Sequence, residues 1–195
     1  MRIAKPIDRI FKRDDTIWHE GDIVDGFGLI ETGTLLCHRY HTDGKVQLAR
    51  LFVPGDIINI ETAVSNKRTS PYFVVAATAG NYIWFPSAVI FGNNALLPNI
   101  VCRLQANLLA NLADDMIRFM KKSDILSQRT VRGRIKMYLN ILREQFGNEV
   151  EIGMNQEEFA QYLCVDRSSL SEELNKMRRE GLIDFKKKRF SLLFD

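Results

Sequence analysis

The segment that follows Asp166 carries cations and hydroxyl groups at positions that would share one face of a short helix. Asp166 is a residue type favoured at a helix N-cap, and apolar residues recur after it at every third or fourth position. The opposite face would present Arg167, Ser168, Ser171 and Lys176. An arginine can donate two hydrogen bonds to guanine, and hydroxyl groups can contact phosphates. The pattern therefore predicts a helix that reads DNA in the major groove.

A second short helix is predicted immediately upstream. Asn155 followed three residues later by Glu158 is capping-box chemistry, and apolar residues come directly after it. Only Cys164 and Val165 separate this helix from the next, so the two would form a helix-turn-helix. An earlier helix over residues 130–145 is predicted to serve as their scaffold.

A basic hairpin is predicted beyond Gly181, where apolar and polar residues alternate around a run of cations. Residues 176–189 contain seven cations and two anions, a local charge of +5. A tetrabasic run alone is usually a solvated turn, and two capped helices alone are common in helical proteins. Their order and spacing together predict a winged helix-turn-helix.

The first half of the chain has the pattern of short β-strands. β-branched and aromatic runs alternate with turn residues, of which Asp43-Gly44 is the best hairpin turn, while Gly33 and Gly55 are expected at strand entrances. Six strands are predicted, at residues 16–19, 27–31, 34–40, 45–52, 73–78 and 82–85. So many short strands favour a small barrel or sandwich.

The apolar spacing changes from two to about 3.6 after residue 94, which predicts one helix over residues 95–122. At about 1.5 Å per residue this helix would span about 40 Å, more than a small barrel needs to cover its own face. We therefore expect it to pack against its counterpart in a second chain, the alternative being its own barrel. The residues assigned to the dimer face are Leu97, Val101, Leu104, Leu108, Leu112 and Phe119. The predicted domains are a β-domain over 1–94, this dimerisation helix over 95–122 and a DNA-binding domain over 123–195.

These segments resemble the Crp/Fnr family of bacterial transcription regulators. The resemblance is carried by residues 158–174 and 177–185, and upstream by Thr16-Ile-Trp-His-Glu-Gly-Asp, Ile30-Glu-Thr-Gly and Phe52-Val-Pro-Gly-Asp-Ile. It covers nearly the whole chain in the family's order. It implies an α+β fold, in which an N-terminal β-roll, cupin-like and similar to a cyclic-nucleotide-binding domain, is joined by a long dimerisation helix to a C-terminal winged helix-turn-helix.

The resemblance also implies a homodimer that binds double-stranded DNA at a palindromic operator, with recognition helices about 34 Å apart. RNA polymerase would be a further partner. Base-reading positions fall on Arg167, Ser168 and Glu172, to which the helical face adds Ser171. The residues expected at phosphates are Arg132, Asn155, Gln156, Asp166, Ser169, Lys176, Lys186 and Lys188. Many relatives carry Arg where this chain has Glu172, so its carboxylate could accept from a cytosine amino group instead.

The family's cyclic-nucleotide site is altered in this chain. It needs a Gly-Glu pair for the ribose and an Arg for the phosphate, but Asn59-Ile60 and Ser70 align there. A phosphate without a bidentate guanidinium loses its strongest interaction, so cyclic AMP is not expected to be the ligand. The pocket either takes a less charged effector of unknown identity or is vestigial. Its candidate residues are Asn59, Ile60, Glu61, Ser70, Phe119 and Met120.

No other cofactor is predicted. The three cysteines form no CxxC pair, and none lies before Cys37, which argues against an iron-sulfur cluster. For haem, the only histidines that could serve as an axial ligand are His19, His38 and His41, and nothing but their residue type supports them. The alternative function is a cupin-like binding protein or enzyme with a helical tail that does not bind DNA. Because no His-x-His spacing or catalytic set accompanies the barrel, we do not expect an enzyme. A net charge of +3 is too small to indicate by itself whether the protein binds nucleic acid. The charged residues at the start of the chain predict a cytoplasmic protein without a signal peptide.

Overall fold

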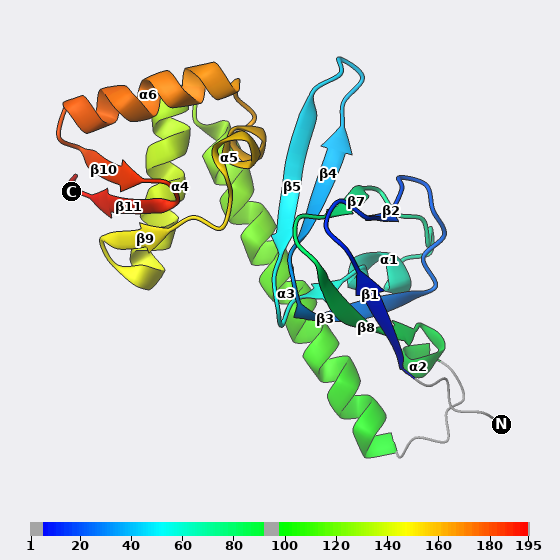
Figure 1. The fold of residues 1–195 in the computed structure, drawn as a ribbon. Coiled ribbons are helices and arrows are strands. Elements are labelled where there is room, and N and C mark those ends of the chain that lie inside the picture. The colour runs from blue at the N-terminus through cyan, green and yellow to red at the C-terminus, as the bar shows by residue number, and fades with distance from the viewer. Residues whose placement is uncertain (1–5, 92–97, 195) are drawn as a thin grey trace. The chain divides into compact units, whose positions relative to one another are not determined.

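The computed structural model describes residues 6–91 and 98–194 (Figure 1). The chain divides into two compact units, Met1–Met116 and Ile117–Asp195. The boundary between them falls within one long helix, α3 (Pro98–Ser127). Within the described ranges, no helix combines the length and apolar character needed to cross a membrane.

The first unit contains a β-roll built from two four-stranded antiparallel sheets. One sheet has the strand order β1-β8-β3-β6 and the other has the order β2-β7-β4-β5. The strands are β1 (Ile7–Phe11), β2 (Thr16–Trp18), β3 (Gly26–Thr32), β4 (Leu35–Tyr40), β5 (Val46–Phe52), β6 (Ile57–Ile58), β7 (Phe73–Ala76) and β8 (Gly80–Pro86). All six predicted strands are present. The strands that were not predicted are β1, which charged residues interrupt, and β6, which has only two residues.

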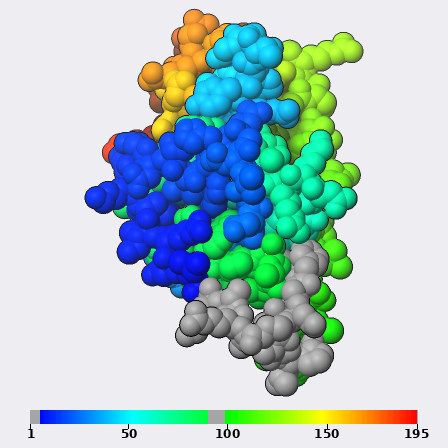
Figure 2. All heavy atoms as spheres, turned by 90° about the vertical axis from the view of Figure 1, so that its right-hand side faces the viewer, coloured from blue at the N-terminus to red at the C-terminus, as the bar shows by residue number. Residues whose placement is uncertain are grey.

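Aromatic side chains fill the space between the two sheets. The rings of Trp18, Tyr82 and Trp84 lie 5.5 to 6.3 Å apart, centre to centre, and all three residues are buried. The backbone of β3 comes close to this cluster, because a Cβ at Gly26 would lie 2.3 Å from the carbonyl oxygen of Phe85. The interior of the β-roll is therefore packed by its own side chains. The residues of this unit, coloured from blue through cyan to green, form much of the face shown in Figure 2.

The predicted turns close as expected. Gly44 adopts a φ of 80° in the loop that joins β4 to β5, a left-handed conformation that glycine adopts without strain. Gly33 and Gly55 also have positive φ. The prediction for these three glycines is confirmed.

Helix α3 packs one apolar face onto the β-roll within the first unit. Leu108 is 4% exposed and belongs to a cluster with Phe27 of β3 and Ile60 of α1 (Ile60–Val64). Leu104 and Leu112, one turn to either side, pack against the same cluster. A further short helix, α2 (Ala88–Phe91), follows β8.

This packing corrects the predicted dimer face. Leu104, Leu108 and Leu112 face the β-roll of their own chain, so their assignment to a second chain is wrong. The physical reason is that α3 carries two apolar stripes, and the stripe of leucines is the one that covers the β-roll. Val101 is half-buried, Phe119 is exposed, and Leu97 lies outside the described residues.

The second unit is a helical domain with a small sheet. Its elements are α4 (Val131–Phe146), β9 (Glu149–Glu151), α5 (Gln156–Leu163), α6 (Arg167–Arg179), β10 (Ile183–Lys186) and β11 (Arg189–Leu192), and the sheet has the order β10-β11-β9. The last turns of α3 also belong to it, because Ile125 is buried and Lys122 Nζ lies 3.9 Å from the ring centre of Tyr162. Helix α3 therefore runs on to Ser127, past the predicted end at residue 122.

Candidate nucleic-acid interface

Helices α5 and α6 form the predicted helix-turn-helix. Helix α5 begins with a complete capping box, in which Asn155 Oδ1 accepts from Glu158 N at 2.9 Å and Glu158 Oε2 accepts from Asn155 N at 2.6 Å. The helix ends at Cys164, which adopts a left-handed conformation with a φ of 53°. The chain then enters α6 after Val165 and Asp166. Asp166 occupies the N-cap position as predicted, but its side chain makes no capping hydrogen bond.

Arg134 of α4 fixes the turn between the two helices. Its Nη1 donates to the carbonyl oxygens of Leu163 and Cys164 at 2.9 and 3.0 Å, and its Nε donates to Gln128 O at 3.0 Å. The two bonds from Nη1 satisfy carbonyls that the end of α5 would otherwise leave without a partner. No signal in the sequence points to this role, because the carbonyls come from segments far apart in the chain.

Helix α6 divides cleanly into a buried and an exposed face. Leu170, Leu174 and Met177 are almost fully buried, as predicted. Ser171 is half-buried, and the exposed side chains are Arg167, Ser168, Glu172, Asn175, Lys176, Arg178 and Arg179. The predicted base-reading residues are thus brought together on one helix face.

Arg167 remains available to a ligand. Its Nε lies 3.7 Å from Glu157 Oε2 of α5, and the side chains are 65% and 54% exposed. An exposed ion pair of this length contributes little free energy, so a nucleobase can compete with it.

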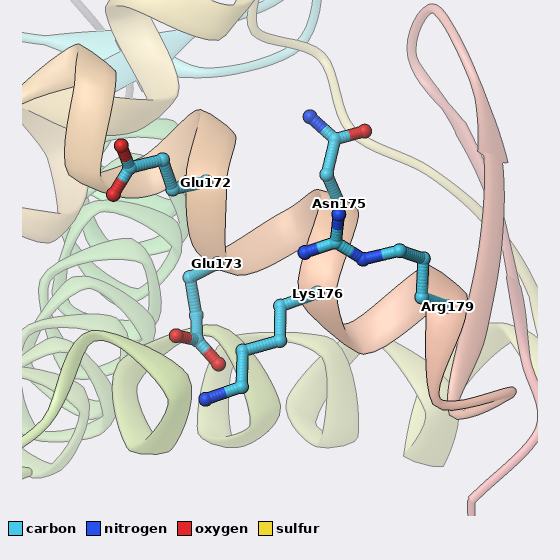
Figure 3. Close-up of a pocket in the computed structure, with 5 residues that line it drawn as sticks. All are labelled: Glu172, Glu173, Asn175, Lys176 and Arg179. Atoms are coloured by element: carbon cyan, nitrogen blue, oxygen red, sulfur yellow. The ribbon is translucent and has the colours of Figure 1, made fainter.

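The exposed face of α6 is hollowed further along the helix (Figure 3). The hollow is lined by Glu172, Glu173, Asn175, Lys176 and Arg179. Asn175 Nδ2 donates to Ser171 O, one turn earlier in the helix, at 2.9 Å, which leaves the amide oxygen as its outward acceptor. Asn175 and Arg179 were not predicted from the sequence, although their spacing of three and seven residues from Glu172 places them on the same stripe.

Arg132 does not lie free at the surface. Its Nε donates to Glu173 Oε1 at 2.5 Å, and its Nη1 and Nη2 donate to the two oxygens of Glu180 at 2.7 and 3.0 Å. These hydrogen bonds, first those to Glu180 and then those to Glu173, raise the pKa of Arg132, and Arg132 lowers the pKa of Glu180. Its assignment as a phosphate contact is therefore not supported. The sequence could not show that two carboxylates from another part of the chain bind the guanidinium.

The predicted wing is a β-hairpin with a basic tip. Strands β10 and β11 pair from Ile183 with Leu192 to Lys186 with Arg189, and Lys187 adopts a positive φ in the turn. Lys186 is exposed, and Lys188 Nζ donates to Gly153 O at 3.1 Å while its side chain stays at the surface. Strand β9 pairs with β11 and extends the hairpin to three strands.

The remaining predicted phosphate contacts lie near the helix starts. Asn155 and Gln156 are exposed at the start of α5, although the amide oxygen of Asn155 is used in the capping box. Asp166 is exposed and Ser169 is half-buried at the start of α6, and Lys176 borders the hollow.

The candidate effector residues do not form one described pocket. Ile60 is fully buried in the cluster with Leu108, and the Ser70 hydroxyl donates to Tyr72 O at 2.8 Å, so both side chains have contacts within the fold. Their assignment to an effector pocket stays a prediction. Asn59 is buried in a left-handed conformation. Glu61 is exposed, and Phe119 and Met120 are exposed residues of the second unit.

Comparisons with known proteins match both units. The cyclic nucleotide-binding domain family matches residues 8–97, and the Crp-like helix-turn-helix domain family matches residues 133–193. The nitrogen fixation regulation protein FixK of Azorhizobium caulinodans is 21% identical over 193 residues, which cover 95% of this chain and 75% of the relative.

Solved structures agree with these matches. FixK2 from Bradyrhizobium japonicum superposes with a TM-score of 0.75 at 15% identity, over 96% of this chain and 92% of that one. A CRP-family transcriptional regulator from Thermus thermophilus superposes with a TM-score of 0.69 at 25% identity, over 95% and 91% of the two chains. With a cyclic-nucleotide-binding type β-roll, a long helix and a winged helix-turn-helix in this order, the chain belongs to the Crp/Fnr family of DNA-binding transcriptional regulators.

Proposed function

We propose that this regulator acts as a homodimer that reads a palindromic operator with α6 of each protomer and holds the flanking phosphates with its wing. The observation that carries the proposal is the exposed face of α6. It presents a guanidinium at Arg167, a hydroxyl at Ser168 and a carboxylate at Glu172 on one side of a helix whose other side is buried. Such a set offers donors for guanine and an acceptor for cytosine.

The wing supplies contacts of a different kind. Lys186 and Lys188 project from a short hairpin whose tip is exposed and carries four successive cations, Lys186 to Arg189. Cations of this kind bind phosphates irrespective of sequence and set the register of the helix in the groove.

A second apolar stripe on α3 supports the homodimer. It consists of residues spaced alternately by four and three positions, which is the heptad pattern of a two-stranded coiled coil. Its members are Cys102, Ala106, Leu109, Ala113, Met116 and Met120, all of which are exposed. Leu109 and Met116 are 69% and 61% exposed, so a protomer alone leaves large apolar side chains in water. We infer that a second copy covers this stripe in place of the predicted leucines.

Cyclic AMP is not the proposed effector. No guanidinium occupies the aligned phosphate position, because Ser70 lies there with its hydroxyl engaged by the backbone of Tyr72. The aligned ribose position holds Ile60, whose side chain is part of the core. A cyclic phosphate would lack a charged partner at this place. The proposed effector is therefore a small molecule other than a cyclic nucleotide. The proposal includes no haem and no iron-sulfur cluster. In this proposal the DNA-bound dimer acts on RNA polymerase in the cytoplasm.

The test is binding of the full chain to duplexes selected from its own promoter region, followed by fluorescence anisotropy at several salt concentrations. We expect a saturable complex of two chains per operator duplex. Random DNA should displace the operator poorly, and the affinity should fall steeply as the salt concentration rises. Equal affinity for operator and random duplexes, or one chain per duplex, would contradict the proposal.

A further inference from the structure

Arg132 joins the start of one helix to two separate points on the recognition helix. It is the second residue of α4, Glu173 lies in the middle of α6, and Glu180 is the C-cap residue of α6. Glu173 takes Nε and Glu180 takes both terminal nitrogens in a bidentate pair. One side chain thus fixes α6 against α4 at points about two helical turns apart.

The two glutamates also change what Arg132 can offer to DNA. The guanidinium of Arg132 is shared between two carboxylates, and Lys176 and Arg179 act electrostatically on Glu180 as well. Arg132 therefore has no nitrogen left without a carboxylate partner to offer a phosphate. In Figure 3, Glu173 lies on the side of α6 that faces α4, away from Asn175 on the outer face. Bidentate arginine-carboxylate pairs have a fixed geometry that a single lysine charge cannot reproduce.

We propose that Arg132 is a positioning residue for the recognition helix, and that Glu173 and Glu180 exclude it from the cations that bind DNA phosphates. The proposal rests on DNA binding by α6. It assigns to Arg132 a role in base discrimination rather than in phosphate neutralisation. The hydrogen bonds to Glu180 and Glu173 raise the pKa of Arg132, and the pKa of Glu180 is lowered in turn, so both ends of the pair are charged at neutral pH.

The salt dependence of binding separates the two roles. Each neutralised phosphate adds about 0.9 to the slope of log affinity against log salt concentration. Under the proposal, Arg132→Gln leaves this slope unchanged but lowers the ratio of operator to random-DNA affinity roughly fivefold, because α6 is no longer held in register. Arg132→Lys loses the same discrimination, since a lysine keeps the charge without the fork. A phosphate ligand would instead be preserved in Arg132→Lys and would flatten the slope in Arg132→Gln.

Substitutions that remove the carboxylate partners of Arg132 should change the salt dependence of DNA binding in the opposite direction. In Glu173→Gln with Glu180→Gln, Arg132 of each protomer becomes available to a phosphate and the slope for the dimer steepens by about 1.8, so that a fourfold rise in salt costs about 12-fold more affinity than in the parent. Adding Arg132→Gln returns the slope to the parent value. Glu144→Gln is the matched control, because it removes one exposed carboxylate near the other end of α4.

The measurement is anisotropy with an operator duplex and a random duplex across salt concentrations, with circular dichroism to confirm folding. If the double variant does not fold, Glu180→Gln alone serves, because its side chain is 38% exposed. Two results would overturn the proposal: an Arg132→Gln slope that is flatter by about 1.8 for the dimer, or a slope in the Glu180 variants equal to that of Glu144→Gln. Failure of every form to bind DNA would instead refute the binding surface on α6.

Discussion

Arg50 of β5 donates from Nη1 to Asp115 Oδ2 of α3 at 2.5 Å, and this pair joins the β-roll to the long helix within the first unit. The side chains of Arg50 and Asp115 are 22% and 17% exposed, and Asp56 lies 3.5 Å from Nη2 of the same guanidinium. A charged hydrogen bond in such a partly buried place is stronger than one at the open surface.

Asp115→Asn should therefore lower the free energy of unfolding by about 1 to 3 kcal/mol, because Arg50 loses its short charged partner. Urea unfolding measures the change. The neighbouring Asp114 is exposed, so Asp114→Asn is the control and should change stability by less than about 0.5 kcal/mol. Equal effects of the two substitutions would contradict this role for the pair.

Two adjacent leucines on α3 should give opposite results. Leu109 is 69% exposed on the heptad stripe, so Leu109→Asp should turn the dimer into a monomer while leaving the protomer folded. Leu108 is buried against the β-roll, so Leu108→Ala should cost about 2 to 5 kcal/mol of protomer stability. Light scattering and urea unfolding measure the two effects. A Leu109→Asp variant that stays dimeric refutes the stripe, with exposed Asn107→Asp as the control for added charge.

Arg167→Ala should remove discrimination at one base pair of each half-site. The expected loss is about 1 to 3 kcal/mol for the preferred base, with little change for the other bases at that position. Binding to a set of operator duplexes with single substitutions measures it. An unchanged order of preference at every position would show that Arg167 does not read a base.

Lys188→Gln should weaken binding to every duplex alike and flatten the salt slope by up to about 1.8 for the two wings of a dimer, because the wing contributes charge rather than base contacts. Anisotropy with operator and random duplexes measures both quantities. A loss confined to the operator would mean that the wing reads bases.

The contribution of Glu180 to the stability of the chain should be present at neutral pH and lost at low pH. The pKa of Glu180 is lowered in the folded state, mainly by its hydrogen bond with Arg132. A carboxyl with a lowered pKa stabilises the fold above its unfolded pKa of about 4.3 and loses this contribution as the pH falls through the folded value. Thermal unfolding of the parent and of Glu180→Gln should therefore differ most near neutral pH and converge in acid. A difference that is constant with pH contradicts the assignment.

Local patterns predicted most of the fold. The capping box at Asn155, the hairpin glycine Gly44 and the apolar face of α6 each depend on neighbours within a few residues, and each is confirmed. Three leucines of the predicted dimer face, Leu104, Leu108 and Leu112, were wrongly assigned because α3 carries two stripes at helical spacing, and only the packed structure shows that these leucines belong to the β-roll.

Long-range contacts account for the parts of the site that the sequence did not predict. The bonds from Arg134 to Leu163 and from Arg132 to Glu180 join residues 29 and 48 positions apart. No periodicity connects such residues. Asn175 and Arg179 are different, because helical spacing from Glu172 alone would have placed them on the exposed face.

Two copies of α6 are proposed to read one operator across a two-fold axis, and every prediction for DNA binding depends on this arrangement. The most direct measurement is selection of duplexes from a random pool by the full chain, followed by sequencing. We expect an inverted repeat whose half-site centres lie about 10 base pairs apart, one turn of DNA. Enrichment of a single unpaired half-site, or no enrichment at all, would contradict it.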